Sequence, residues 1–245
     1  MRIAALYDIH GNLPALEAVL EQVLKTGVDQ IVFGGDVVLG PMSGACLDKL
    51  SEIKRPVFCI QGNCEVAILE QMEGRLQSNF PKPVLEAIRW TADRLLPRHQ
   101  ALMAQWPKTL RLKVEGLGRV LFCHATPRSE TENFTCLTPE EKLLPIFEEA
   151  GADVVVCGHT HMQFDRKIGS VRVINAGSLG MPFGKPGAYW LELGLSAELK
   201  YLPYDLTAAA DRMRKTAYPL VDEFIENYLV NPPSEEQMQK ILNGE

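Results

Sequence analysis

The sequence lacks the cysteine pattern of a disulfide-bonded protein. Its six cysteines form no C-x-x-C pair, and Cys59, Cys123 and Cys157 lie within apolar runs. A free thiol in such a run behaves as a small hydrophobic side chain. Because a disulfide framework is typical of secreted proteins, we expect reduced thiols and a cytoplasmic location.

Long hydrophobic runs and positive charge are also scarce. No apolar stretch approaches the ~20 residues of a membrane span, and the opening residues, MRIAALYDIH, turn polar too early for a secretion signal. The chain has 25 Lys and Arg against 31 Asp and Glu, which gives a formal net charge of −6. We therefore expect neither a membrane nor a long nucleic acid as partner. A small anion would need a local source of positive charge.

Six short apolar runs are present, and most are continuous rather than alternating, which is typical of strands covered on both faces. They begin at Arg2, Gln30, Pro56, Val120, Asp153 and Val171. Helical patterns at 13–27 and 44–53 separate the first three. This order of strand and helix predicts an α/β fold with a parallel sheet.

The remaining segments predict helices and hairpins. Residues 65–107 carry no strand signal, so we expect a helical cap there, made of two helices broken at Pro97. Hairpins are expected within 109–123 and 188–205, and a helical tail over 206–245. At 245 residues, with 46% hydrophobic residues, the chain suffices for a single domain with this insert and tail.

Polar residues gather where the predicted strands end. These segments are Asp8-Ile9-His10-Gly11-Asn12, Gly35-Asp36, Gly62-Asn63-Cys64-Glu65, His124 and Gly158-His159-Thr160-His161. Four of the five histidines lie in them, and only His99 lies elsewhere. Ligands of open α/β sheets bind outside the carboxyl ends of the strands. We therefore expect these side chains to converge on one site.

Seven of these side chains offer oxygen or nitrogen atoms to a metal: Asp8, His10, Asp36, Asn63, His124, His159 and His161. Because residues i and i+2 of an extended chain point to the same side, Asp8 and His10 face one point, as do His159 and His161. Seven ligands are too many for one ion with about four to six and suit two ions that share a carboxylate. The donor types favour Mn, Fe, Zn, Ni or Co.

Each motif alone has a plainer interpretation. An Asp-x-His triplet is usually a turn, and Gly-Asn is a common turn dipeptide. Ser178 in AGSLG offers a hydroxyl nucleophile, but a glycine-rich turn is the simpler role. The joint occurrence in five loops is what indicates a site.

In their order along the chain, D-x-H, G-D, G-N-x-[DE], H and G-H-x-H resemble the calcineurin-like metallophosphoesterase superfamily. The resemblance covers residues 1 to about 190, and DIHGN, GDVVLGP, AIRWTADRL and NAGSLG are similar to its small prokaryotic phosphodiesterase branch. It implies a two-layered β-sandwich flanked by helices, which some schemes class as α+β, with a dinuclear metal centre at one end.

The resemblance also implies which residues hold which ion. One ion is expected on Asp8, His10, Asp36 and His161, and the other on Asp36, Asn63, His124 and His159, with Asp36 as the bridge. A hydroxide between the ions would then attack the phosphorus of a small phosphoester. Two ions, two aspartates and one hydroxide leave a charge of about +1, which a phosphodiester neutralises and a monoester exceeds.

The sequence departs from the family pattern in two places. Cys64 stands where many members have a histidine that is thought to protonate the leaving oxygen. A thiol with a pKa near ~8.5 is a poorer acid for this purpose, so we expect Cys64 to be a weak substitute or a filler. No arginine follows GGDVVLGP, so substrate contact is expected from the metals and from neutral groups such as Asn12 and Asn63.

Two classes of alternative remain open. A phosphomonoesterase, or a pyrophosphatase acting on dinucleoside polyphosphates, would use the same centre. A metal-binding scaffold without catalysis would be expected to lose ligands, yet all seven are present. The natural substrate, the native metal and any oligomeric state stay open at this point.

Overall fold

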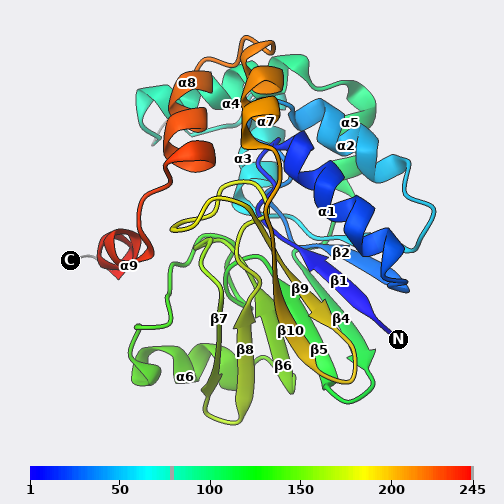
Figure 1. Cartoon of the computed structure of the whole chain (residues 1–245). Coiled ribbons are helices and arrows are strands. Elements are labelled where there is room, and N and C mark those ends of the chain that lie inside the picture. The colour runs from blue at the N-terminus through cyan, green and yellow to red at the C-terminus, as the bar shows by residue number, and fades with distance from the viewer. Residues whose placement is uncertain (78–79, 244–245) are drawn as a thin grey trace.

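The protein is described here from a computed structural model, in which residues 1–77 and 80–243 are placed. Two mixed β-sheets pack face to face, and helices cover their outer faces (Figure 1). This arrangement confirms the predicted α/β two-layered sandwich flanked by helices.

The first sheet has the order β10-β9-β1-β2-β3. Its strands are β1 (Ile3–Leu6), β2 (Gln30–Phe33), β3 (Val57–Cys59), β9 (Ala188–Leu193) and β10 (Ala197–Leu202). The first three are parallel and are connected by α1 (Leu13–Lys25) and α2 (Ser43–Ser51), as the βαβ pattern predicted. The hairpin of β9 and β10 joins this sheet through an antiparallel pairing of β9 with β1.

The second sheet has the order β4-β5-β6-β8-β7. Its strands are β4 (Thr109–Val114), β5 (Gly118–Cys123), β6 (Val154–Cys157), β7 (Phe164–Ile168) and β8 (Val171–Asn175). Here β5, β6 and β8 run parallel, and β4 and β7 close the two edges in antiparallel fashion. The helix α6 (Glu140–Glu148) covers the outer face of this sheet.

Strand β1 shows why the apolar runs are continuous. Ile3 and Ala5 face the second sheet, whereas Ala4 and Leu6 face the helices on the outer side, and all four are fully buried. Successive side chains of a strand point to opposite faces, so a strand buried on both sides has no polar position.

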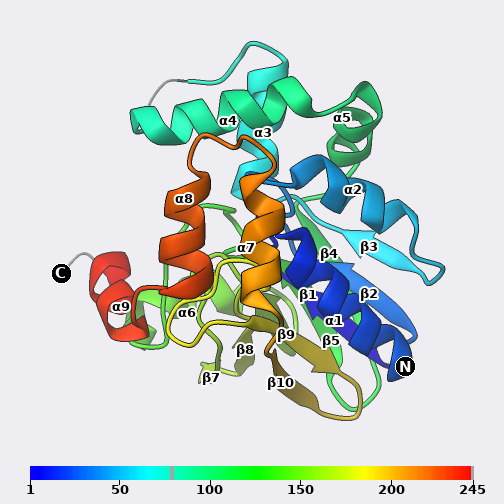
Figure 2. The same ribbon diagram turned by 45° about the horizontal axis from the view of Figure 1, so that its top comes forward.

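The insert forms a set of helices at one end of the molecule: α3 (Asn63–Met72), α4 (Lys82–Arg94) and α5 (Pro97–Ala104). Figures 1 and 2 place α4 and α5 beside α2 and α7. The helix break that was predicted at Pro97 lies slightly earlier, since α4 ends at Arg94 and Pro97 opens α5. Proline is favoured at a first helical position because its missing N–H is not needed there.

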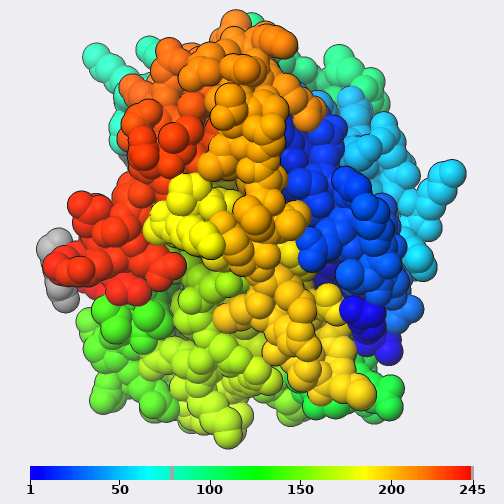
Figure 3. Space-filling model, in the orientation of Figure 1, coloured from blue at the N-terminus to red at the C-terminus, as the bar shows by residue number. Residues whose placement is uncertain are grey.

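The tail consists of α7 (Leu206–Arg214), α8 (Val221–Phe224), the π-helix η1 (Ile225–Val230) and α9 (Glu235–Asn243). Figure 3 shows it as a continuous layer, orange to red, on one face of the molecule. Side chains of α4, α7, α8 and η1 form a common apolar cluster. No helix in the described part of the chain is long and apolar enough to cross a membrane.

Candidate metal centre

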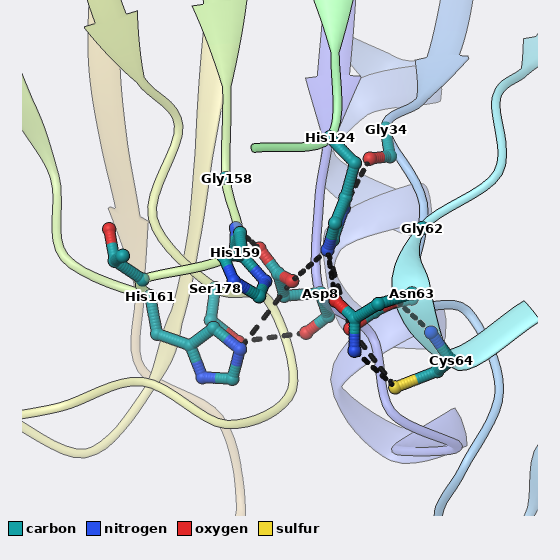
Figure 4. A network of polar contacts seen from close by, with 12 residues as sticks. Asp8, Gly34, Gly62, Asn63, Cys64, His124, Gly158, His159, His161 and Ser178 are labelled. Atoms are coloured by element: carbon teal, nitrogen blue, oxygen red, sulfur yellow. Dashed lines mark hydrogen bonds and ion pairs between the residues drawn. The ribbon is translucent and has the colours of Figure 1, made fainter. Parts of the chain in front are cut away.

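The loops after β1, β2, β5 and β6 meet the first turn of α3 at one edge of the two sheets (Figure 4). Backbone hydrogen bonds connect them. The N–H of Asp8 donates to the carbonyl of Gly35 (3.1 Å), and that of His10 donates to the carbonyl of Asp36 (2.9 Å). The structure therefore brings together the segments that carry the seven predicted ligands.

Asp8, His10 and His161 form one group, in which the candidate ligand atoms all lie within 4.8 Å of one another. The Nε2 atoms of His10 and His161 are 3.2 Å apart. The Oδ1 atom of Asp8 lies 3.5 Å from Nε2 of His161 and 3.9 Å from Nε2 of His10. Three ligand atoms thus surround one small space.

Asp36, His124 and His159 form a second group of the same kind, again within 4.8 Å. Nε2 of His124 lies 3.4 Å from Oδ2 of Asp36 and 3.0 Å from Oδ1 of Asn63. The same Oδ2 of Asp36 lies 3.7 Å from Nε2 of His10, which belongs to the first group. Asp36 therefore lies between the two groups, as the bridging position requires.

One oxygen in this site has no hydrogen-bond partner. Oδ1 of Asp8 is buried and accepts no hydrogen bond from the described residues, although the Nε2 atoms of His10, His124 and His161 lie 3.5–3.9 Å away. Burying a carboxylate oxygen without a donor is costly. A cation placed among these atoms removes that cost, so the donor set fits a metal.

Hydrogen bonds from Nδ1 to backbone carbonyls orient two of the imidazoles. Nδ1 of His124 donates to the carbonyl of Gly34 (2.9 Å), and Nδ1 of His161 donates to the carbonyl of Met181 (2.7 Å). A proton on Nδ1 leaves the lone pair of Nε2 free. Backbone carbonyls in this role are typical of metal-ligating histidines.

Backbone strain is concentrated in the candidate ligands. Seven non-glycine residues have positive φ in the described part of the chain, and five of them are Asp8, His10, Asp36, His159 and His161, with φ between 47° and 66°. This left-handed region is uncommon for residues with a side chain, and strained residues cluster at functional sites. The glycines between the ligands permit close approach, because a Cβ on Gly62 would lie 2.2 Å from Oδ1 of Asp36.

Burial and the two carboxylates shift the pKa values of the site's histidines in opposite directions. Burial lowers the pKa of His10 and of His159 to about 4, so both imidazoles are neutral at neutral pH. Burial also lowers the pKa of His124, but the carboxylates of Asp36 and Asp8 outweigh it and raise the value to about 10. Burial raises the pKa of the Asp8 and Asp36 carboxyls. The neighbouring histidines together lower it by a larger amount, so both carboxyls stay ionised.

Most of the sequence matches a known family. The profile described as "Calcineurin-like phosphoesterase superfamily domain" covers residues 1–193, which include all seven candidate ligands. The chain belongs to the calcineurin-like phosphoesterase superfamily. Phosphodiesterase YfcE of Escherichia coli (strain K12) is 27% identical over 199 residues, which cover 77% of this chain and 85% of YfcE. The predicted family and its small prokaryotic branch are thereby confirmed.

Two solved structures show the same fold as this calcineurin-like chain. The hypothetical protein PH1004 from Pyrococcus horikoshii OT3 superposes with a TM-score of 0.80 at 18% identity, and covers 95% of this chain and 99% of its own. A metallophosphoesterase from Sphaerobacter thermophilus gives a TM-score of 0.70 at 23% identity, with coverage of 92% and 97%. At this identity the likeness is one of fold.

Glu65 is a further residue of this candidate site, and the sequence suggested no role for it beyond its place in G-N-x-[DE]. Its buried carboxylate accepts four backbone N–H bonds, from Gly62 (2.7 Å), Asp36 (2.8 Å), Val37 (2.8 Å) and Val38 (3.2 Å). Burial and the charge of Asp36 raise the pKa of Glu65 to about 7, and the backbone donors act against that shift. Glu65 therefore ties the Asp36 loop to the start of α3.

Cys64 points its thiol at Asp36 in the candidate site. Its Sγ lies 3.1 Å from Oδ2 of Asp36, and its N–H donates to Oδ1 of the same residue (2.8 Å). Burial and the charge of Asp36 raise the pKa of this thiol well above its usual value. The geometry supports a thiol that holds Asp36 in place.

The contacts of Asn12 do not support the predicted phosphate contact. Asn12 is fully buried and caps α1, because its Oδ1 accepts from the N–H of Ala15 (3.1 Å). Its Nδ2 donates to the carbonyl of Gly180 (2.9 Å) and to the hydroxyl of Tyr204 (3.0 Å). Both amide hydrogens are therefore used within the protein.

Ser178 is also buried, and its hydroxyl donates to the carbonyl of Asp8 (2.8 Å). This contact agrees with a turn residue, as the glycine-rich sequence indicated.

Proposed function

We propose that this chain hydrolyses a small phosphodiester with two divalent ions held by the seven candidate ligands. The observation that carries the proposal is the pair of ligand groups joined through Asp36, with the unpartnered Oδ1 of Asp8 beside them. With Asp36 counted in both groups and Asn63 added to the second, each ion would have four donors, of the type that the Mn, Fe, Co, Ni and Zn series takes.

The candidate ligands would be shared between the two ions. Asp8, His10 and His161 would hold one ion, His124, His159 and Asn63 the other, and Asp36 both. When bound, such a pair of ions supplies a hydroxide nucleophile and polarises the phosphoryl oxygens. Asp8, His10, Asp36 and His124 are buried, whereas Asn63, His159 and His161 are partly exposed. Substrate would therefore approach from the side of these three.

The charges around the centre support a diester over a monoester. The cations near His124 are already neutralised, because Lys108 pairs with Glu130 (2.9 Å) and Arg128 pairs with Glu132. The chain thus offers no free arginine or lysine at this position, in the part that the structure describes, for the second charge of a phosphomonoester. About one positive charge remains after two ions, two aspartates and a hydroxide are counted.

The test is turnover of bis-p-nitrophenyl phosphate and of p-nitrophenyl phosphate, measured with Mn, Fe, Co, Ni and Zn in turn. We expect a higher kcat/KM for the diester with at least one metal. A preference for the monoester would contradict the proposal and favour a phosphomonoesterase. Cleavage of a dinucleoside polyphosphate alone would favour a pyrophosphatase. Bound metal without any turnover would favour a scaffold.

A further inference from the structure

A pocket of about 270 Å³ opens beside the candidate metal centre and has His10 in its wall. The other walls come from the cap helix α4, which contributes Val84 and Ala87, and from α8 and η1 of the tail. Because the pocket reaches a candidate ligand, whatever fills it lies next to the reacting phosphate.

The tail side of this pocket is aromatic. Tyr218, Phe224 and Tyr228 line it. The ring of Phe224 meets that of Tyr218 edge-on, with centroids 6.4 Å apart at 89°, and lies 5.9 Å from that of Tyr228 at 60°. Tyr218 and Phe224 are buried and Tyr228 is partly exposed, so the two buried rings support Tyr228, and Tyr228 offers its ring to an occupant of the pocket.

The backbone at this pocket is unusual in three places. Leu39, which lines it, and Ala217, which precedes Tyr218, are the two remaining non-glycine residues with positive φ in the described part of the chain (65° and 55°). Asn227 and Tyr228 lie in the π-helix η1. Strained residues and π-helical turns occur preferentially at functional sites, so this wall has the character of a binding site.

The three aromatic residues, Tyr218, Phe224 and Tyr228, lie outside the part of the chain that matches the family, which ends at residue 193. The tail that carries them is nonetheless fixed to that part. Arg212 of α7 pairs with Glu17 of α1 (2.6 Å), and the hydroxyl of Tyr204 accepts from Asn12 (3.0 Å). The domain shared by the family thus supplies the candidate ligands, and the tail of this chain supplies the pocket next to them.

The polar groups of the pocket limit the charge of its occupant. Glu223 is its acidic residue, and no Lys or Arg is among the described residues that line it. An anionic group would be repelled by Glu223 and find no partner. The volume lies just below the range of about 300–1,000 Å³ that is usual for drug-sized ligands, so it suits a single ring system.

We propose that this pocket binds an uncharged aromatic ring on one ester group of the substrate, while the phosphate lies at the candidate metal centre. The inference rests on the proposed phosphodiesterase function and narrows its substrate class. Stacking on the partly exposed ring of Tyr228, which Phe224 holds in place, would supply the affinity, since stacking on an aromatic side chain is worth about 1–3 kcal/mol per ring.

The test uses the monomethyl esters of benzylphosphonic acid and methylphosphonic acid, called benzylphosphonate and methylphosphonate below, and compares their binding to the manganese-loaded protein by calorimetry. Both esters carry one negative charge, as a phosphodiester does, and methoxide is a poor leaving group, so the two probes differ in the ring. We expect benzylphosphonate to bind at least about tenfold more tightly. Equal dissociation constants would overturn the inference.

Two variants and one control localise the effect. Val84→Trp fills the pocket from α4, so the preference for benzylphosphonate should fall to about onefold while the Kd of methylphosphonate stays unchanged. Arg89→Trp, at an exposed position of the same helix outside the pocket, should keep the preference. Tyr228→Leu removes one aromatic face and should lower the preference about fivefold. A preference that survives both pocket variants would also overturn the inference.

The outcome for the pocket is separable from that for the metal centre. If bis-p-nitrophenyl phosphate is cleaved and methylphosphonate binds, but the ring adds no affinity, then the pocket inference alone fails. If neither phosphonate binds and no ester is cleaved, the proposed function fails and the pocket inference fails with it.

Discussion

At the residue scale, the candidate ligands keep conformations that a glycine would adopt more readily. Asp8, His10 and Asp36 each have positive φ, at a cost of about 1–3 kcal/mol for each such residue. Hydrogen bonds hold them there, including one from the N–H of His159 to Oδ2 of Asp8 (2.9 Å) and one from the N–H of Gly180 to the carbonyl of Asp8 (2.9 Å). In the proposed function the side chain is a metal ligand, so glycine cannot replace it.

The first prediction concerns Asp36, which lies between the two ligand groups. Asp36→Asn keeps the volume of the side chain but removes its charge, so it should lower turnover of bis-p-nitrophenyl phosphate by more than about 100-fold, because even hydrogen-bond partners of metal ligands cost about 10–100-fold when mutated. His161→Ala should have a similar effect. Circular dichroism should show that both variants remain folded. Full turnover in both would contradict the dinuclear centre.

The second prediction concerns Cys64, whose thiol contacts Asp36 and is 4% exposed. In the native protein iodoacetamide should label the exposed Cys136 and leave Cys64 unmodified, because alkylation needs an accessible thiolate. Peptide mass spectrometry measures both. Cys64→Ala should lower turnover of a nitrophenyl ester less than about tenfold, since this leaving group needs no proton. Rapid labelling of Cys64, or a much larger loss, would show a reactive role.

At the element scale, the strands that end in polar residues could be predicted from the sequence. The runs that begin at Arg2, Gln30 and Asp153 became β1, β2 and β6, because strands covered on both faces need continuous apolar residues. Three elements were not predicted. Helix α3 precedes the two helices that were expected in the insert. The strand β7 lies at a sheet edge and alternates little, with the sequence FDRKI, and α6 contains Pro145.

The backbone conformations of the ligand loops could not be predicted from the sequence. Positive φ at His159 or Asp36 is imposed by tertiary contacts, since the local sequence disfavours it. Asn12, which was predicted to contact the phosphate, lies one residue before Leu13 and is the N-cap of α1. Asparagine before a helix is a signal that was available.

The third prediction concerns the link that Glu65 makes between the Asp36 loop and α3. In Glu65→Gln an amide NH₂ would face backbone N–H groups that now donate to a carboxylate oxygen, so we expect unfolding free energy to fall by about 3 kcal/mol. Urea denaturation at pH 8, above the pKa of about 7, measures it. Glu70→Gln in the same helix is the control and should change stability by less than about 0.5 kcal/mol. Equal stability of the two variants would contradict the role of Glu65.

At the scale of the whole molecule, the two sheets come from similar sequence patterns. The runs of β1, β2 and β3 resemble those of β5, β6 and β8, and the division into two sheets depends on pairings between distant segments, such as β9 with β1. Local patterns contain no record of such pairings. The same holds for the tail, whose helices were predicted but whose place beside the candidate centre was not.

The last prediction concerns the stability of the whole protein with and without metal. Two buried carboxylates and four imidazoles, one of them His124 with a raised pKa, face one another at the sheet edge. A ligand at about 100 times its Kd stabilises the folded state by about 2.7 kcal/mol. For a chain of this size that corresponds to a rise in Tm of about 5–10 °C.

We expect this rise when Mn or Zn is added back to protein dialysed against EDTA, followed by calorimetry. Asp36→Asn, which removes the shared ligand, should show a clearly smaller rise. Mg is a useful comparison, because it prefers oxygen ligands and the candidate centre offers four imidazoles. An equal rise with Mg, or no rise with any divalent ion, would mean that the seven side chains do not act as a transition-metal site.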